Sequence, residues 1–345
     1  MTSHAGRLRR QGASEEQMAT ELSAINEACC EPPLADAEVR QIASSVARYP
    51  PGPIAPERPT SGSPRSDWPT PLSEAAFHGV AGELVRLISP HSEADEAALL
   101  FQLLTFVGNV TGRYAHFRAE QDAHFLNLFT VIVGETSKAR KGSSLSQIRY
   151  VFRGIDPQWT EHRVTGGLST GEGLIREVRD GAPRSGKEAH DDLGVSDKRL
   201  LVCEPELARV LQTMERDTNT LSAVLREAFD SGNLRTMTKS SSMRATGAHI
   251  SLIAHVTEQE LHRLLSHTAI SNGFANRFLW VSARRSRCLP DGGRIKSVDF
   301  TQALDGLHRA VEFGTRLSEL VRGDRASALW HDVYGRLSEG RLAGC

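Results

Sequence analysis

The stretch VIVGETSKARKGSS, residues 131–144, decides the fold. An apolar run rich in β-branched residues ends at Gly134. Lys141 follows, with hydroxyl residues at Ser143 and Ser144 before a new helical pattern. A strand that leads into a glycine turn and then into a helix is the arrangement of a phosphate-binding loop, in which backbone N–H groups and a lysine hold phosphate. The stretch therefore predicts a nucleotide site on an α/β fold.

The spacing of this loop departs from the usual GxxxxGK[ST] pattern. Lys141 stands seven residues after Gly134 where the pattern has six, Arg140 replaces the second glycine, and Gly142 separates the lysine from the serines. A basic surface turn is therefore the alternative, and the choice between Lys138 and Lys141 as the γ-phosphate contact stays open. The predicted nucleotide-binding residues are Gly134, Glu135, Thr136, Ser137, Lys138, Ala139, Arg140, Lys141, Gly142, Ser143 and Ser144.

Further apolar runs alternate with helical patterns along the chain. RLLVCE at 199–204, HISLIAHV at 249–256 and RFLWVSA at 277–283 are typical of strands. Amphipathic patterns at 205–216 and 220–230 predict helices between them. Strands that alternate with helices predict a mainly parallel sheet with helices on both faces.

The chain divides into four regions. Residues 1–50 carry two or three short helices, with the capping box S-x-x-Q at 14–17. Residues 51–70 are rich in proline, serine and glycine, which is the composition of a disordered linker. Residues 71–300 hold the predicted core, which opens with one amphipathic helix and one that is apolar nearly all round. Residues 301–345 form a partial C-terminal helical region, and we expect the chain to be a fragment.

Composition excludes several classes of protein. The 41 basic and 42 acidic residues nearly cancel, so contact with nucleic acid requires a local basic patch. Five cysteines show no spacing typical of a disulfide framework or a zinc site, which favours a reducing compartment. No apolar run approaches the roughly 18 residues of a membrane span. We expect a cytoplasmic protein that does not enter membranes.

Two polar residues end predicted strands. Glu204 closes RLLVCE, and a carboxylate beside a phosphate loop holds Mg²⁺ through water or orients the attacking water in P-loop ATPases. The alternative is that Glu204 caps the helix that Pro205 begins. His255 lies near the end of HISLIAHV, where we expect a polar group that senses the γ-phosphate. Ser143, Ser144 and Glu204 are the predicted Mg²⁺ residues.

Basic residues indicate two further roles. Arg277, or one of the arginines at 284, 285 and 287, is the candidate arginine finger that reaches the nucleotide of a neighbouring subunit. The polar loop at 230–247 carries Arg235, Lys239 and Arg244, which suit contacts with the phosphates of DNA. A solvated basic loop is the alternative, and the loop has no aromatic residue for base stacking.

Together these stretches resemble a known group, the RecA-like P-loop helicases found beside primase modules in prophages, plasmids and integrative elements. The resemblance rests on VGETSKARKGSS, GGLSTGEGLI, RLLVCEPELARVL, TNTLSAVLREAFDSGNLRTMTK, ATGAHISLIAHVT and NGFANRFLWV, in this order over about 75–290. Residues 1–50 resemble the small helical module that follows the catalytic domain of such primases.

The resemblance implies a RecA-like ATPase with ATP and Mg²⁺ as cofactors, acting on single-stranded or forked DNA during mobile-element replication. It implies a ring or filament of subunits, with a hexamer as one form, and a primase-polymerase module in cis or in trans. Glu172 matches a family position that is the alternative to Glu204 for the water-activating carboxylate. Two other functions stay open: a non-catalytic DNA-binding adaptor with a degenerate nucleotide site, and a nucleotidyltransferase.

Overall fold

The computed structural model describes residues 2–10, 13–29, 33–49, 68–135, 139–181, 192–216, 218–237 and 243–338. The chain forms two compact units, Met1–Trp68 and Pro69–Cys345. The predicted linker at 51–70 lies almost wholly outside the described residues.

The first unit is a bundle of three short helices: α1 (Thr2–Arg10), α2 (Glu15–Cys29) and α3 (Asp36–Ala47). The predicted capping box is confirmed, because the backbone N–H of Ser14 donates to Gln17 Oε1 at 2.8 Å and that of Gln17 donates to Ser14 Oγ at 3.2 Å. Residues spaced along one face of each helix make the core, namely Ala5, Leu8, Met18, Leu22, Val39, Ala43 and Val46.

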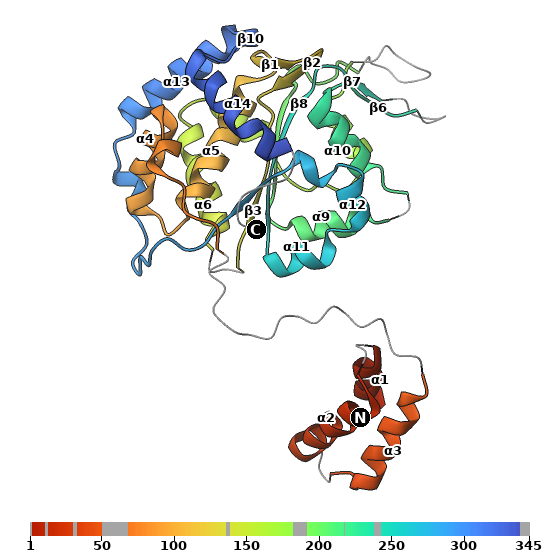
Figure 1. The fold of residues 1–345 in the computed structure, drawn as a ribbon. Helices are drawn as coiled ribbons and strands as arrows, with labels where there is room; N and C mark the ends of the chain where they lie inside the picture. Colours follow the sequence, from red (N-terminus) through yellow and green to blue (C-terminus); the bar gives the residue numbers. More distant parts are fainter. Residues whose placement is uncertain are drawn as a thin grey trace. The chain divides into compact units, whose positions relative to one another are not determined.

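The second unit contains a five-stranded sheet in which every described pairing is parallel. Its strand order is β4-β5-β8-β3-β9 (Figure 1). The strands are β3 (Phe129–Val133), β4 (Val164–Thr165), β5 (Arg199–Glu204), β8 (His249–Val256) and β9 (Leu279–Ser282). Four of them confirm the predicted strands, and the two-residue strand β4 was not predicted. The predicted α/β class with a parallel sheet flanked by helices is thus confirmed.

Each face of the sheet is covered by its own helices (Figure 1). One face packs against α4 (Gly79–Ile88), α5 (Glu96–Thr111), α6 (Lys141–Phe152), α7 (Pro157–His162) and α13 (Thr301–Arg316). The other face packs against α8 (Gly171–Arg176), α9 (Leu207–Met214), α10 (Leu221–Asp230) and α11 (Glu258–Leu264). All eight residues of β8 are buried, which explains its uninterrupted apolar character.

Smaller elements surround this sheet. A second sheet joins β1 (His116–Ala119), β2 (Asp122–Phe125) and β10 (Glu319–Leu320), and β6 (Leu234–Arg235) pairs with β7 (Arg244–Ala245). Single helical turns and the last helices complete the unit: η1 (Glu74–Ala76), η2 (Ser89–His91), α12 (His267–Ser271), η3 (Ala275–Arg277), η4 (Ile295–Ser297) and α14 (Asp324–Ser338).

These elements correct two predictions. The segment at 230–247 is not simply a loop, because it contains the antiparallel pair β6–β7. The region at 301–345 is not wholly helical, because β10 extends the sheet formed by β1 and β2. The sequence also predicts an exposed hairpin or loop at 180–198, of which residues 182–191 lie outside the described residues.

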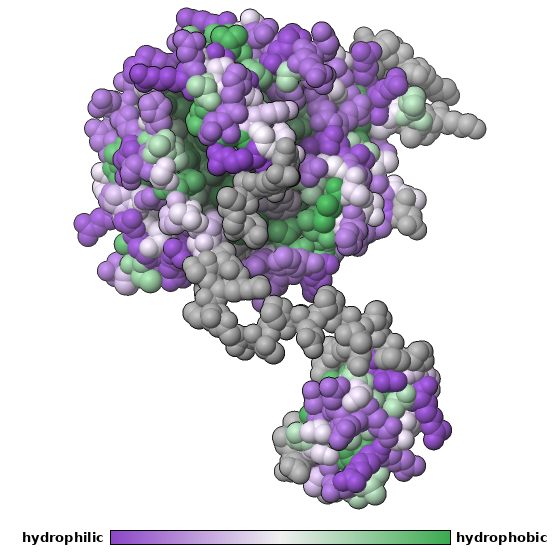
Figure 2. Space-filling model, in the orientation of Figure 1, coloured by the Kyte–Doolittle hydropathy of each residue, from purple (hydrophilic) through white to green (hydrophobic). Residues whose placement is uncertain are grey.

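The surface of the second unit is mainly hydrophilic on the face drawn in Figure 2, and apolar residues show chiefly where that face is hollowed. Within the part of the chain that the structure describes, no helix combines the length and the apolar composition needed to cross a membrane.

Candidate phosphate-binding site

Gly134 follows β3 at a point where three backbone segments meet. Its N–H donates to the carbonyl of Val256 at 3.2 Å, and the N–H of Ala283 donates to Val133 at 2.7 Å. A Cβ at Gly134 would lie 2.3 Å from the carbonyl oxygen of Ala283 and 2.8 Å from the Cβ of Ala139. Because such contacts are prohibitive, glycine is required for the chain to leave β3 between β8 and β9.

The loop beyond Gly134 returns at Ala139, while Thr136, Ser137 and Lys138 lie outside the described residues. Arg140 has a left-handed backbone, with φ at 51°. Residues other than glycine are sterically strained in this left-handed conformation. The usual motif has glycine at this position, which avoids that strain. The Arg140 guanidinium pairs with Glu93, Nε to Oε2 at 2.5 Å.

Lys141 begins α6 and folds its side chain back over the loop. Its Nζ donates to the carbonyl of Gly134 at 2.6 Å, to Val256 at 3.0 Å and to Glu135 at 3.4 Å. Burial lowers the pKa of Lys141 and the nearby Glu260 partly opposes that shift. The ammonium is thus held by backbone carbonyls at the place where the sequence predicts a phosphate.

The two serines face opposite ways. Ser144 is fully buried, and its Oγ donates to the Lys141 carbonyl at 2.7 Å and accepts from Gln102 Nε2 at 3.0 Å. Ser143 is exposed in the first turn of α6. Of the two predicted Mg²⁺ hydroxyls, Ser143 is therefore the one that faces solvent.

His255 is buried on β8, and its Nε2 lies 3.4 Å from Gln102 Nε2. Burial, followed by the charge of Lys141, lowers the pKa of His255 to about 4, so the imidazole is neutral near pH 7. Thr257, the next residue but one, forms a capping box with Glu260 at the start of α11. A neutral histidine therefore stands beneath the charged lysine at the end of β8.

Glu204 is also buried, at 2% exposure, and its carboxylate already has three donors. Oε1 accepts from the N–H groups of Gly167 and Leu168, both at 2.5 Å, and Oε2 pairs with Arg209 at 3.0 Å. These bonds anchor the loop after β4 to the end of β5. The alternative role as a helix cap is not seen, because α9 has Glu206 at its N-cap position.

The remaining catalytic candidates are more dispersed. Glu172 is half-buried in the first turn of α8. Arg277 makes a bidentate ion pair with Asp230, at 3.0 and 2.5 Å. Arg277 precedes β9, and Gly134 follows the parallel neighbouring strand β3. Arg277 therefore lies at the amino ends of the strands, whereas Gly134 lies at their carboxyl ends. Arg277 therefore does not belong to the loop of its own chain.

The segment after β9 lies at the same edge of the sheet as the loop. Glu93 joins the two, since its Oε1 accepts from the N–H of Leu289 at 2.8 Å while Oε2 pairs with Arg140. The arginine side chain at 287 donates to Ser89 Oγ at 3.2 Å, and the backbone N–H at 284 donates to Asp95 Oδ2 at 3.0 Å.

The predicted DNA-contacting arginines face each other across the β6–β7 pair. Arg235 and Arg244 are directly opposite in the register and both are exposed, whereas Lys239 lies outside the described residues. Like charges at such positions are destabilising by themselves. Arg244 already has an anionic neighbour, since its Nε lies 3.9 Å from Asp180 Oδ2.

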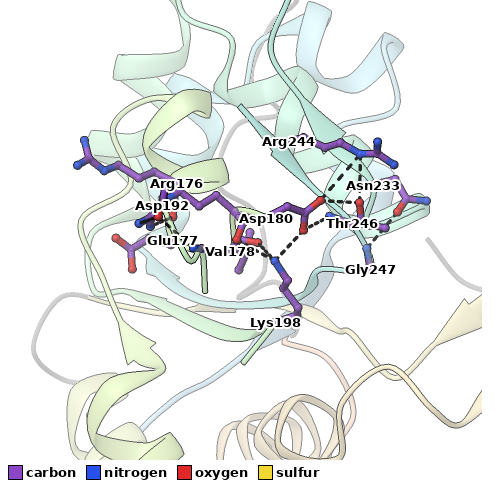
Figure 3. Close-up of polar contacts among 12 residues, drawn as sticks. Arg176, Glu177, Val178, Asp180, Asp192, Lys198, Asn233, Arg244, Thr246 and Gly247 are labelled. Carbon is purple, nitrogen blue, oxygen red and sulfur yellow. Dashed lines mark hydrogen bonds and ion pairs between the residues drawn. The ribbon is translucent and has the colours of Figure 1, made fainter. Parts of the chain in front are cut away.

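A carboxylate network supports the base of this hairpin (Figure 3). Asp180 accepts from Lys198 Nζ at 2.8 Å and from the N–H and hydroxyl of Thr246 at 3.0 and 2.6 Å. Burial opposes ionisation, but these donors together hold the pKa of Asp180 at about 2. Arg244 Nε is 3.9 Å from the same carboxylate, so the hairpin is tied to the start of β5.

The loop lies at a topological switch point of the sheet. The neighbours β3 and β8 are followed by helices on opposite faces, α6 on one and α11 on the other. In parallel sheets of this kind, ligands bind in the crevice outside the carboxyl ends of the strands at such a point. Gly134, Lys141 and His255 all lie at this crevice.

Gln102 and Glu93 were not predicted as site residues, although both contact the loop. Gln102 sits in a helix that is otherwise mainly apolar, and a polar residue in such a run was the available signal. Among the described residues, no cluster of three or more histidine, cysteine or carboxylate side chains could hold a metal ion.

The N-terminal bundle has a recognisable sequence family. Residues 1–52 match Primase C terminal 1 (PriCT-1). This match confirms the predicted primase-type module and associates the chain with primase-type replication proteins. No curated protein matches the chain.

Proposed function

We propose that the unit Pro69–Cys345 binds and hydrolyses ATP and acts on DNA as a RecA-like helicase or translocase, beside the PriCT-1-like module. The observation that carries this proposal is the Lys141 ammonium, held on the carbonyls of Gly134 and Val256 at the switch point of a parallel sheet. The association of the first module with primase-type proteins supports a role in DNA replication.

The loop residues fit a phosphate group. Arg140 provides no side-chain cap to α6, and no acid lies in its first turn, so no acidic side chain of the helix itself accepts from its first N–H groups. The Glu93 carboxylate beside this turn pairs with the Arg140 guanidinium. Together with the helix dipole, the first N–H groups favour an anion. Among the described residues, Lys141 donates only to carbonyl groups. A phosphate oxygen would give the ammonium a negatively charged acceptor instead.

The fit to Mg²⁺ is weaker than the fit to phosphate. Ser143 offers an exposed hydroxyl, whereas Ser144 and Glu204 are buried and already hydrogen-bonded. Bound Mg²⁺ would offset charge on the phosphates. We assign Ser143 as its protein contact, and Glu172 or Glu204 as the carboxylate that orients water.

The direct test measures ATP binding and phosphate release by the purified full-length chain with Mg²⁺. We expect hydrolysis that is faster with single-stranded DNA. Binding of ATP without phosphate release would favour the alternative, a DNA-binding adaptor. The saturated Glu204 carboxylate is the observation that favours this alternative. Absence of ATP binding in calorimetry would contradict the assignment of the loop.

DNA binding should depend on Arg235 and Arg244. We expect Arg235→Ala with Arg244→Ala to weaken binding to single-stranded DNA and to reduce the slope of log affinity against log salt by about 1.4, since each lost phosphate contact removes about 0.7. Fluorescence anisotropy over a salt series measures both quantities.

The matched control replaces two other exposed arginines, Arg153→Ala with Arg309→Ala, which lie in or next to α6 and α13. These changes remove the same total charge from another part of the unit. If the control pair lowers the salt slope as much as the hairpin pair, the β6–β7 hairpin is not the DNA contact.

We also propose that subunits share nucleotide sites in a ring, with Arg277 or an arginine after β9 reaching a neighbour. Arg277 lies at the opposite end of the strands from the loop of its own chain. This location supports a contact with the nucleotide of a neighbouring subunit. The ion pair of Arg277 with Asp230 would then have to open on assembly.

A further inference from the structure

Gln102 is a wholly buried amide beneath the phosphate loop. It lies on α5, and its Nε2 contacts Ser144 Oγ at 3.0 Å and His255 Nε2 at 3.4 Å. Ser144 belongs to the first turn of α6, and His255 lies near the end of β8. One side chain therefore touches both elements that form the crevice.

The hydrogen-bond roles follow from the number of protons available. The Ser144 hydroxyl donates its single proton to the Lys141 carbonyl, so Ser144 Oγ accepts from the Gln102 amide. The second amide proton of Gln102 is then available to His255, whose Nε2 must carry the lone pair. The ring proton of a neutral His255 consequently resides on Nδ1.

These contacts form a closed ring. Gln102 donates to Ser144, Ser144 donates to the Lys141 carbonyl, and the Lys141 ammonium donates to the carbonyl of Val256 at 3.0 Å. Val256 is the neighbour of His255, which returns to Gln102. When Lys141 turns to a phosphate, it exchanges at least one of its three carbonyl contacts, and release of Val256 would open this ring of contacts at the residue next to His255.

The burial of Gln102 at this position lowers the stability of the fold. Its Oε1 is buried and has no hydrogen-bond partner among the described residues. A buried polar atom without a partner is unfavourable, and an apolar side chain of similar volume would pack there without that cost. The two contacts of its Nε2 group, with Ser144 and with His255, account for a glutamine at this position.

We infer that Gln102 is a positioning residue that fixes the His255 tautomer and links the state of the phosphate loop to the end of β8. The part of this inference that concerns catalysis rests on the proposed ATPase function. The part that concerns His255 does not, because the tautomer exists without nucleotide.

The first experiment records long-range ¹H–¹⁵N spectra of the full chain labelled with ¹⁵N-histidine at pH 7. His255→Gln identifies the signals of that ring. We expect the Nδ1–H tautomer in the native protein, with a shift of the His255 Nε2 signal in Gln102→Leu. The control, Thr105→Val, removes a buried hydroxyl one turn along α5 that contacts Thr130 Oγ1 at 2.8 Å, and it should leave His255 unchanged.

The second experiment compares kcat for ATP hydrolysis with the Kd of ATP. In Gln102→Leu we expect kcat to fall about tenfold, the lower end of the range for residues that orient a functional group, while Kd changes less than about threefold because Lys141 and the start of α6 remain. Thr105→Val, which also removes a buried hydrogen-bonding group from α5, should leave kcat unchanged.

The outcomes separate the inference from the proposed function. If the native protein does not bind ATP, the proposed function fails, and the spectra alone decide the inference. An Nε2–H tautomer in the native protein, or a His255 signal that Gln102→Leu leaves in place, overturns it. Equal losses of kcat in Gln102→Leu and Thr105→Val overturn the catalytic part.

Discussion

Lys141→Ala is expected to lower the rate of ATP hydrolysis by roughly 100-fold or more, the range seen when one preorganised electrostatic contact to a transition state is removed. The structure gives the physical reason. The Lys141 ammonium is partly desolvated, and its hydrogen bonds to the described residues are all to carbonyl groups, so it is poised to neutralise phosphate charge. Phosphate release at saturating ATP measures the effect.

The matched control is Lys296→Ala, which removes the same charge from the exposed turn η4. Its turnover should equal that of the native chain. If Lys141→Ala turns over ATP at the native rate, the role of γ-phosphate contact passes to Lys138. A Lys138→Ala variant would then show the loss instead.

Acid should destabilise the second unit in a pH range set by two buried histidines. Burial lowers the pKa of both His249 and His255 to about 4, from the usual 6.5. The unfolded chain binds protons first as the pH falls, so the stability is fully present above about pH 6.5 and declines toward pH 4. Between pH 7.5 and pH 5 we expect a loss of about 2 kcal/mol for each histidine, about 4 kcal/mol in total. Urea unfolding over this pH series measures it.

The two aspartates with the lowest pKa values titrate below this pH range. Asp180 and Asp192, whose pKa values are held at about 2, contribute losses only below about pH 4. His255→Gln should halve the slope between pH 7.5 and pH 5, whereas the exposed His262→Gln should leave it unchanged. A stability that is flat across this range would show that neither buried ring stays neutral.

The sequence predicts the central strands well because burial on both faces leaves a continuous apolar run. β5 and β8 have the bounds that the apolar runs at 199–204 and 249–256 indicate. β4 was missed because two residues, Val164–Thr165, are too few to show the alternation of apolar and polar residues that is typical of a strand. The β1–β2 pair was missed for a similar reason, since its four-residue strands are largely exposed and only partly apolar.

The site was predictable only where its residues are close in the chain. Gly134 and Lys141 are seven residues apart, and the structure joins them through a hydrogen bond. The partners of Gln102 lie 42 and 153 residues away, so no local pattern could pair them. Two of the three donors to Glu204 are backbone N–H groups 36 and 37 residues earlier, which leave no trace in residue type.

β8 joins the two ends of the sheet that the proposed function uses. The basic hairpin leads into its amino end through Ala248, and His255 lies at its carboxyl end. Eight residues of strand span about 26 Å. Because every one of them is buried, the strand cannot slip by a residue or bend without disturbing a close-packed core. If the hairpin binds DNA as proposed, a load on it would therefore reach the Lys141 loop through a strand that keeps its register.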